Sequence, residues 1–338
     1  MNKEGGVAAA PLPWQQQQWN HLYQCHQADR LAHALLLTGQ IGLGKDLFAA
    51  HFAKTLLCKQ SSISGACQYC RDCSWVAANT HPDLSRIAPE KISVGIKIEQ
   101  IRKAMQSLNQ TTSSLYKIFI INPADGLFVA SSNALLKSLE EPTSRTLFIL
   151  ITDKPGLLLP TVRSRCQIIR FTPPHRTIGK DWLRKQLPDP DTQFLDGLYE
   201  LADAAPLQAV AYAKTGLFEF YQCLLRAMLG LLKKEIDPIQ LAESYIKTDS
   251  AVLLRCLMKI VCAVLTCKLQ IKSFNSESLR VISVLANAVH TDFLFEYFDK
   301  LLNLQRAIKI ALNQQLMLED LFCCWSLREV VSVNIKLC

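Results

Sequence analysis

A glycine-rich segment, residues 39–46, lies between a short apolar run and a stretch with helical spacing. The apolar run, residues 34–37, predicts a buried strand, and residues 47–57 predict a helix. Strand, glycine loop and helix in this order form the context of a phosphate-binding loop, in which backbone N–H groups cradle phosphates and a lysine meets their outer charges. The segment therefore predicts an α/β fold for this part of the chain.

Three residues of the loop match the phosphate-binding pattern and one departs from it. Gly39, Gly44 and Lys45 stand where the pattern requires them, as candidate nucleotide-binding residues. The next position normally carries Ser or Thr, whose hydroxyl binds the Mg²⁺ that accompanies the nucleotide, but this chain has Asp46. A carboxylate can contact a metal, yet it places a negative charge beside a triphosphate. We therefore expect a degenerate phosphate loop; a loop that only joins strand to helix is the alternative.

The end of a later strand carries a second departure. Residues 117–121 predict a fully buried strand. Proteins that hydrolyse nucleotides on such a loop place an Asp after this strand to hold the metal, often followed by a Glu that orients water. This chain has Asn122 and Pro123, which supply neither the charge nor a base. Asp125 is interpreted as a turn or helix-cap residue.

Four cysteines within sixteen residues have the spacing C-x8-C-x2-C-x2-C. They are Cys58, Cys67, Cys70 and Cys73. Because a Cys-x2-Cys turn lets two thiolates reach one tetrahedral ion, the set predicts a Zn²⁺ module over residues 58–73, with free or redox-active thiols as the alternative. None of the four is a His or an acid, so the site is expected to be structural and not catalytic. His81, which follows, is interpreted as a helix-end or packing residue and not as a ligand.

The rest of the first half continues the alternation of strands and helices. Further strands are expected at residues 84–87, 146–152 and up to Phe171, and further helices at residues 98–108 and 131–141. Alternating short strands and helices predict a parallel sheet covered on both faces.

The second half is expected to be helical. Residues 173–216 predict a small helical lid domain after the sheet domain of residues 1–172. Residues 217–338 predict an all-helical domain, because apolar residues recur at helical spacing and neither Pro nor Gly occurs after Pro238. Six cysteines of this last domain are expected to be buried as small apolar residues: Cys223, Cys256, Cys262, Cys267, Cys323 and Cys324.

Composition excludes several classes of protein. Residues 1–14 contain no apolar signal segment, and the 13 cysteines without an export signal favour reduced thiols or a metal over disulfides, so a cytoplasmic protein is expected and no membrane partner. The net charge of +8 is spread along the chain and permits contact with nucleic acid without requiring it. A zinc-dependent DNA-binding protein is a weaker interpretation, because no basic helix flanks the cysteines.

Several segments together resemble the delta-prime family of bacterial DNA polymerase III clamp loaders, which are AAA+ proteins, and the resemblance runs essentially end to end. The segments that carry it are His-Ala-Leu-Leu-Leu before the loop, the four cysteines, Thr-His-Pro-Asp at 80–83, Asn-Ala-Leu-Leu-Lys-Ser-Leu-Glu-Glu-Pro at 133–142, Arg-Ser-Arg-Cys at 163–166, and residues 313–321. The degenerate loop is similar to delta-prime and unlike the motor subunits, which keep an intact loop.

The resemblance implies a non-hydrolysing stator in a hetero-pentameric ring with the tau/gamma motor subunits and the delta subunit, joined by a helical collar. It implies that Arg165 reaches the ATP site of the adjacent motor subunit, with Lys137 as a candidate second phosphate contact and Arg163 as a structural residue. Leu207 and Gln208 stand where the family's motor subunits carry a nucleotide-sensing arginine. A surface salt bridge for Arg165 and an ordinary solvated lysine at Lys137 are the alternatives.

The resemblance also implies that the chain is an accessory subunit of a DNA-directed DNA polymerase, which is a nucleotidyltransferase, and that it has no independent catalytic centre. It is expected to hold structural Zn²⁺ and to bind no ATP. Through the complex it would help load the sliding clamp onto primed DNA in DNA replication. The alternative is a weakly active AAA+ ATPase in which Lys45 binds nucleotide and Asp46 replaces the usual hydroxyl.

Overall fold

The computed structural model describes residues 11–90, 95–106, 108, 114–188, 190–269, 278–307 and 313–327. The chain divides into two compact units, called here the sheet unit and the helical unit. The sheet unit is residues 1–179 with 205–208, and the helical unit is residues 180–204 with 209–338. The three-domain division of the sequence analysis, with residues 173–216 as a separate lid, stays a prediction.

The sheet unit contains five parallel strands in the order β2-β3-β4-β1-β5. They are β1 (Ala34–Thr38), β2 (Leu84–Ile87), β3 (Lys117–Ile121), β4 (Thr146–Thr152) and β5 (Gln167–Arg170). In the centre of the sheet, Leu36 of β1 pairs with Leu150 of β4 on one side and with Ile168 of β5 on the other. The parallel sheet expected from the sequence is confirmed, and so are the bounds of β2, β3 and β4.

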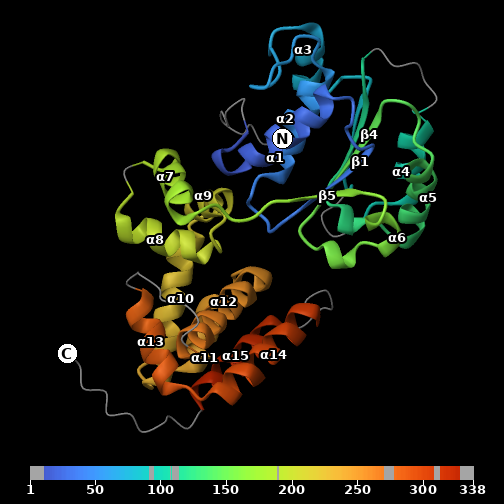
Figure 1. Cartoon of the computed structure of the whole chain (residues 1–338). Coiled ribbons are helices and arrows are strands. Elements are labelled where there is room, and N and C mark those ends of the chain that lie inside the picture. Colours follow the sequence, from blue (N-terminus) through green and yellow to red (C-terminus); the bar gives the residue numbers. More distant parts are fainter. Residues whose placement is uncertain are drawn as a thin grey trace. The chain divides into compact units, whose positions relative to one another are not determined.

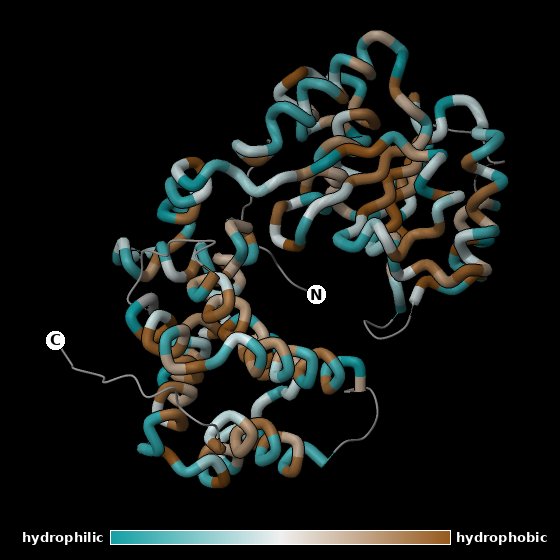
Figure 2. Tube along the Cα trace, turned by 60° about the horizontal axis from the view of Figure 1, so that its bottom comes forward, coloured by the Kyte–Doolittle hydropathy of each residue, from teal (hydrophilic) through white to brown (hydrophobic). Residues whose placement is uncertain are grey.

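Helices cover both faces of this sheet, as Figure 1 shows. Alternate residues of a strand point to opposite faces, so Leu35 and Leu37 of β1 pack with one set of helices and Leu36 packs with the other. The first face is covered by α1 (Gln16–Gln27) and α2 (Lys45–Leu57), and the second by α4 (Ile98–Gln106), α5 (Val129–Glu140) and α6 (Pro160–Arg163). The strands β1, β3 and β4 between them are strongly hydrophobic (Figure 2) because they are buried on both sides.

The carboxyl ends of parallel strands meet at one edge of a sheet, and this edge positions the candidate site. The phosphate loop follows β1, Asn122 follows β3 and Asp153 follows β4. Side chains that are far apart in the sequence are thereby brought together around the start of α2. A short helix, α3 (Arg71–Ala77), carries part of the cysteine cluster after α2.

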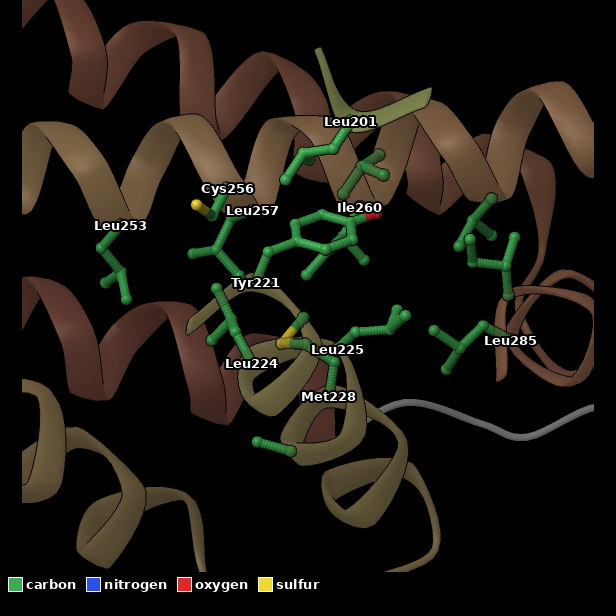
Figure 3. Packing of buried hydrophobic residues seen from close by; sticks show 14 of the residues in the cluster. Leu201, Tyr221, Leu224, Leu225, Met228, Leu253, Cys256, Leu257, Ile260 and Leu285 are labelled. Atoms are coloured by element: carbon green, nitrogen blue, oxygen red, sulfur yellow. The ribbon is translucent and has the colours of Figure 1, made fainter. Parts of the chain in front are cut away.

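The helical unit is built from helices alone in its described residues, as predicted. They are α7 (Arg176–Gln186), α8 (Thr192–Leu201), α9 (Pro206–Lys214), α10 (Leu217–Leu232), α11 (Pro238–Tyr245), α12 (Ser250–Lys268), α13 (Ser278–Ala288), α14 (Thr291–Ala307) and α15 (Gln314–Ser326). The first residues of α7 and of α9 belong to the sheet unit. Figure 3 shows Tyr221 and Met228 of α10 facing Leu257 and Ile260 of α12 in a core of buried side chains.

Helix α12 has the length and hydropathy of a membrane span, and it is the one such helix in the described part of the chain. Leu253, Leu257 and Ile260 are nevertheless buried against other helices of the unit, while Arg255 is exposed. These contacts are those of a core helix in a globular unit.

Only part of the prediction for the late cysteines is correct. Cys256 is buried, but Cys223 and Cys262 are exposed, and the other three are partly buried. The helical period explains the error, because Tyr221, Leu224 and Leu225 occupy the core-facing side of α10 and leave the intervening Cys223 on the outside.

Candidate functional site

The phosphate-loop lysine is saturated by groups of its own chain. The Lys45 Nζ donates to the carbonyl oxygens of Gly39 at 2.7 Å and Gln40 at 2.8 Å, and it lies 2.5 Å from Oδ1 of Asp153. The Lys45 side chain is 4% exposed. Because an ammonium group has three donors, these three acceptors satisfy it completely. The Asp153 carboxylate thus occupies the role that a phosphate would have.

The N-terminal segment covers the same loop. The Gln15 Nε2 donates to the carbonyl oxygens of Leu43 and Gly44, each at 2.9 Å, and the Trp14 Nε1 donates to Leu43 at 3.0 Å. A Cβ atom on Gly44, which has φ of 79°, would lie 2.7 Å from the Leu12 side chain. The loop is therefore packed beneath protein groups as part of the scaffold.

Residues at the start of α9 also contact the loop. The Leu207 backbone N–H donates to the Gly42 carbonyl at 3.2 Å. A Cβ atom on Gly42, which has φ of 81°, would lie 2.4 Å from the Cβ of Gln208. Leu207 and Gln208, which are expected from the resemblance to replace a sensing arginine, therefore lie directly against the loop backbone.

The two departures from the nucleotide-hydrolysing pattern contact each other. The Asn122 Nδ2 donates to Oδ1 of Asp46 at 3.3 Å. Asp125 lies in a 3-10 turn, as the turn interpretation expects, and its Oδ1 accepts a 2.5 Å hydrogen bond from the Thr152 hydroxyl at the end of β4. The acidic groups at this edge thus have partners within the protein.

Arg165 lies between α6 and β5, and its guanidinium is held at the protein surface. Its Nη2 lies 2.6 Å from Oε1 of Glu140, the last residue of α5, and its Nη1 donates to the Thr161 carbonyl at 2.9 Å. The side chain of Arg165 is 36% exposed. The next residue, Cys166, is turned inward, and burial raises the pKa of its thiol to about 12.

Two other basic residues flank Arg165. Lys137 is exposed in the last turn of α5, three residues before Glu140 and so on the same side of the helix. Arg163 is exposed at the end of α6. The described part of the structure shows no ion pair for either side chain. The surface around Arg165 therefore presents several cations.

The four predicted cysteines come together in space. The Sγ atoms of Cys58, Cys67, Cys70 and Cys73 all lie within 4.8 Å of one another, and the Cys58–Cys70 and Cys67–Cys73 pairs are each 3.9 Å apart. A tetrahedral ion with Zn–S bonds of about 2.3 Å requires sulfur atoms about 3.8 Å apart. The cluster therefore fits a metal ion, and the donor set is consistent with structural zinc.

Backbone N–H groups support the sulfur atoms as metal ligands. Cys67 N donates to Cys58 Sγ at 3.3 Å, and the N–H groups of Cys70 and Cys73 donate to the preceding cysteine sulfur at 3.4 Å. Burial raises the pKa of Cys67, but hydrogen bonds from the backbone N–H groups of Cys70 and Tyr69 and from the thiols of Cys58 and Cys70 outweigh burial and lower that pKa to about 6. Cys67 is thereby favoured as a thiolate, the form that binds a metal, whereas burial raises the pKa of the Cys58 and Cys73 thiols.

Neighbouring residues tie the cluster to the sheet unit. Cys58 ends α2, and Cys70 precedes α3 as its N-cap. The Trp19 Nε1 of α1 donates to the Ile63 carbonyl at 2.7 Å. His81 lies outside the cluster, as predicted: its Nδ1 accepts from the backbone of Asp83 at 3.1 Å, and burial lowers its pKa.

Comparison with known proteins gives consistent matches in both halves of the chain. Residues 14–175 match the family model for the DNA polymerase III delta subunit, and residues 217–327 match the model for the C-terminal part of that subunit. DNA polymerase III subunit delta' of Pseudomonas aeruginosa is 37% identical over 69% of this chain and 70% of its own length. The same subunit of Yersinia pestis is 27% identical over 93% and 94%.

A solved structure shows a weaker likeness. The DNA polymerase III gamma subunit-related protein of Thermotoga maritima is 17% identical, with a TM-score of 0.45 over 91% of this chain and 99% of that one.

Proposed function

The chain belongs to the family of DNA polymerase III delta' subunits, and from this premise we propose that it is the non-hydrolysing stator of a bacterial clamp loader. In this role it joins tau/gamma motor subunits and a delta subunit in a hetero-pentamer in the cytoplasm. Arg165 serves the ATP site of the adjacent motor subunit. The assembled ring loads the sliding clamp onto primed DNA.

The contrast between two cations carries this proposal. Lys45, which would serve a nucleotide bound to this chain, is 4% exposed and saturated by Gly39, Gln40 and Asp153. The Arg165 guanidinium is 36% exposed at the surface. The chain therefore presents an accessible cation that can contact phosphates on another subunit, whereas the cation of its own loop is not accessible.

The chemistry of a trans arginine follows from its charge and shape. Phosphoryl transfer places negative charge on the three equatorial oxygens of the transferring group and on the leaving group. A planar guanidinium, which is always protonated, donates to two of these oxygens at once and stabilises that charge. Lys137 would add a second, weaker contact to the same phosphates from the end of α5.

The cysteine cluster supplies the remaining part of the proposal. Cys58, Cys67, Cys70 and Cys73 would hold Zn²⁺ as four thiolate ligands, with no position left open for water or substrate. The ion would fix the end of α2 against the start of α3. The metal is structural in this proposal and takes no part in ATP hydrolysis.

The Arg165→Ala variant tests the proposed function. A ring reconstituted from all subunits with this variant is expected to assemble normally, as measured by native mass spectrometry. Its DNA-stimulated ATPase rate is expected to fall by about 10-fold or more, since a trans arginine contributes about 10³ or more at the site it serves. Arg163→Ala, an exposed arginine two residues away, is the matched control and should leave the rate unchanged.

Two outcomes would contradict the proposal. Unchanged ATPase with Arg165→Ala would remove Arg165 from the mechanism. Stoichiometric binding of labelled ATP by the full, zinc-loaded chain, with turnover that Lys45→Ala abolishes, would favour the alternative of a weakly active ATPase.

A further inference from the structure

We infer that Glu140 is a positioning residue that holds the Arg165 guanidinium ready for the neighbouring ATP site. The inference rests on the proposed function of Arg165 and adds a second residue to it. Glu140 itself does not touch the nucleotide; it acts only through the arginine.

The arginine is held from two elements at once. The Glu140 Oε1 lies 2.6 Å from Nη2, a distance typical of a strong charge-assisted hydrogen bond. The Thr161 carbonyl and the Ser164 hydroxyl accept from Nη1 at 2.9 Å and 3.5 Å. The first contact comes from the end of α5 and the other two from α6 and the residue after it. The plane of the guanidinium is thereby fixed relative to the sheet unit.

This arrangement leaves donors for a ligand. A guanidinium has five N–H donors, and the contacts to Glu140, Thr161 and Ser164 use three of them. The N–H of Nε and one N–H of Nη2 have no acceptor in the described part of the protein. With the side chain 36% exposed, these donors can meet an oxygen anion from outside while the others keep the group in place.

The position of Glu140 in its helix is locally unfavourable. Glu140 is the last residue of α5 and Glu141 is its C-cap. The carboxyl end of a helix carries partial negative charge and favours cations, so two acids there are opposed by the helix dipole. Such a local conflict is typical of residues kept for function. Lys137 supplies one positive charge in the last turn of α5, and Arg165 supplies a second from another element.

Preorganisation explains how Glu140 would affect the rate. A free arginine side chain has many rotamers, and most of them direct the guanidinium away from a given phosphate. An anchored side chain has already lost this freedom before the subunits meet, so more of the interaction is available in the transition state. Removal of the anchor should therefore lower kcat more than it changes the KM for ATP.

The test uses the reconstituted ring and three variants. Glu140→Ala is expected to lower the DNA-stimulated kcat about 3- to 10-fold with KM for ATP little changed. Glu140→Gln, which keeps an acceptor oxygen without the charge, should fall between Glu140→Ala and the unchanged protein. Glu141→Gln is the matched control, with the same chemical change one residue away, and should leave kcat unchanged.

A double-mutant cycle separates positioning from a general structural role. In the Arg165→Ala background, Glu140→Ala should cause no further loss, because its effect passes through the arginine. A further loss of kcat in the double variant would overturn the positioning role of Glu140. An unchanged kcat for Glu140→Ala would also overturn it, provided that Arg165→Ala lowers kcat in the same assay. If Arg165→Ala itself has no effect, the proposed function fails first. If Glu140→Ala does not assemble, the isosteric Glu140→Gln decides by the same criteria.

Discussion

The phosphate loop and the Arg165 segment place a cation in opposite situations within one sheet unit. Lys45 is buried, and a carboxylate that is distant in the sequence, Asp153, neutralises it in a loop covered by residues 12–15 and the start of α9. Arg165 is also paired with an acid, Glu140, yet its guanidinium stays at the surface. An ion pair therefore does not by itself mark a cation as structural or functional; what differs is whether donors remain accessible to a ligand.

The two regions also differ in what supports them. Helix α2 begins at the phosphate loop and ends at Cys58, so the loop and the cysteine cluster are joined by one helix. Arg165 depends on α5 and α6, which cover the other face of the sheet. This difference predicts that perturbations of one region should be felt weakly in the other.

Removal of the metal should have the largest effect. Chelation leaves four thiols within 4.8 Å of one another without a common ligand, and structural zinc sites contribute on the order of 10 kcal/mol in small domains. Because the sheet unit has its own core, we expect local unfolding and not global unfolding. Hydrogen exchange with mass spectrometry should show lost protection at residues 58–77, with residues 129–166 unchanged.

Variants make the metal experiment specific. Cys67→Ser should reproduce the effect of the chelator, and Cys223→Ser, at an exposed cysteine of α10, should not. Equal loss of protection around Arg165 would show that the two regions are not independent. No loss anywhere would argue against a structural metal.

Substitution of Lys45 should come next in size. Lys45→Ala removes an ion pair between a buried lysine and an exposed carboxylate, and two hydrogen bonds to carbonyl oxygens. We expect the free energy of unfolding to fall by about 1–3 kcal/mol, because the hydrogen bonds of a charged, buried donor are lost, while the exposed Asp153 carboxylate can be hydrated. Urea denaturation of the full chain measures this change.

The same Lys45→Ala variant should leave the ATPase rate of the reconstituted ring within about twofold of normal, since on the proposed function this loop binds no nucleotide. Lys154→Ala is the control, because Lys154 is exposed and adjacent to Asp153, and it should change neither stability nor rate. A large loss of ATPase rate without a loss of stability would indicate that the loop takes part in ATP hydrolysis.

The sequence predicts the sheet well because its signals are local. Buried parallel strands are continuous apolar runs, so the bounds of β3 and β4 follow directly from residues 117–121 and 146–152. The cysteine spacing likewise brings its ligands together within one short segment. The short helices α3 and α6 give no clear period over so few residues and were not predicted.

Long-range partners are the part that the sequence does not reveal. Lys45 and Asp153 are 108 residues apart, so no local pattern indicates that the loop lysine is neutralised from within. The partner of Arg165 is on a different element for the same reason, although Glu140 lies in a segment already recognised from its sequence. Two acids at the end of a helix are the signal that could have pointed to it.

The smallest expected effect is a difference in thiol reactivity beside Arg165. Burial raises the pKa of Cys166 to about 12, and its Sγ donates to the Val162 carbonyl at 3.3 Å. At pH 8 only about one in 10⁴ of these thiols is ionised, so iodoacetamide should modify Cys166 far more slowly than the exposed Cys223. The Cys166 rate should rise about tenfold per pH unit between pH 7 and 10, because the thiolate fraction does so below the pKa.

Peptide mass spectrometry after short labelling pulses measures both rates. Equal reactivity of the two cysteines at pH 8 would mean that the segment opens readily in solution, and Arg165 would then not be held in place as its contacts indicate.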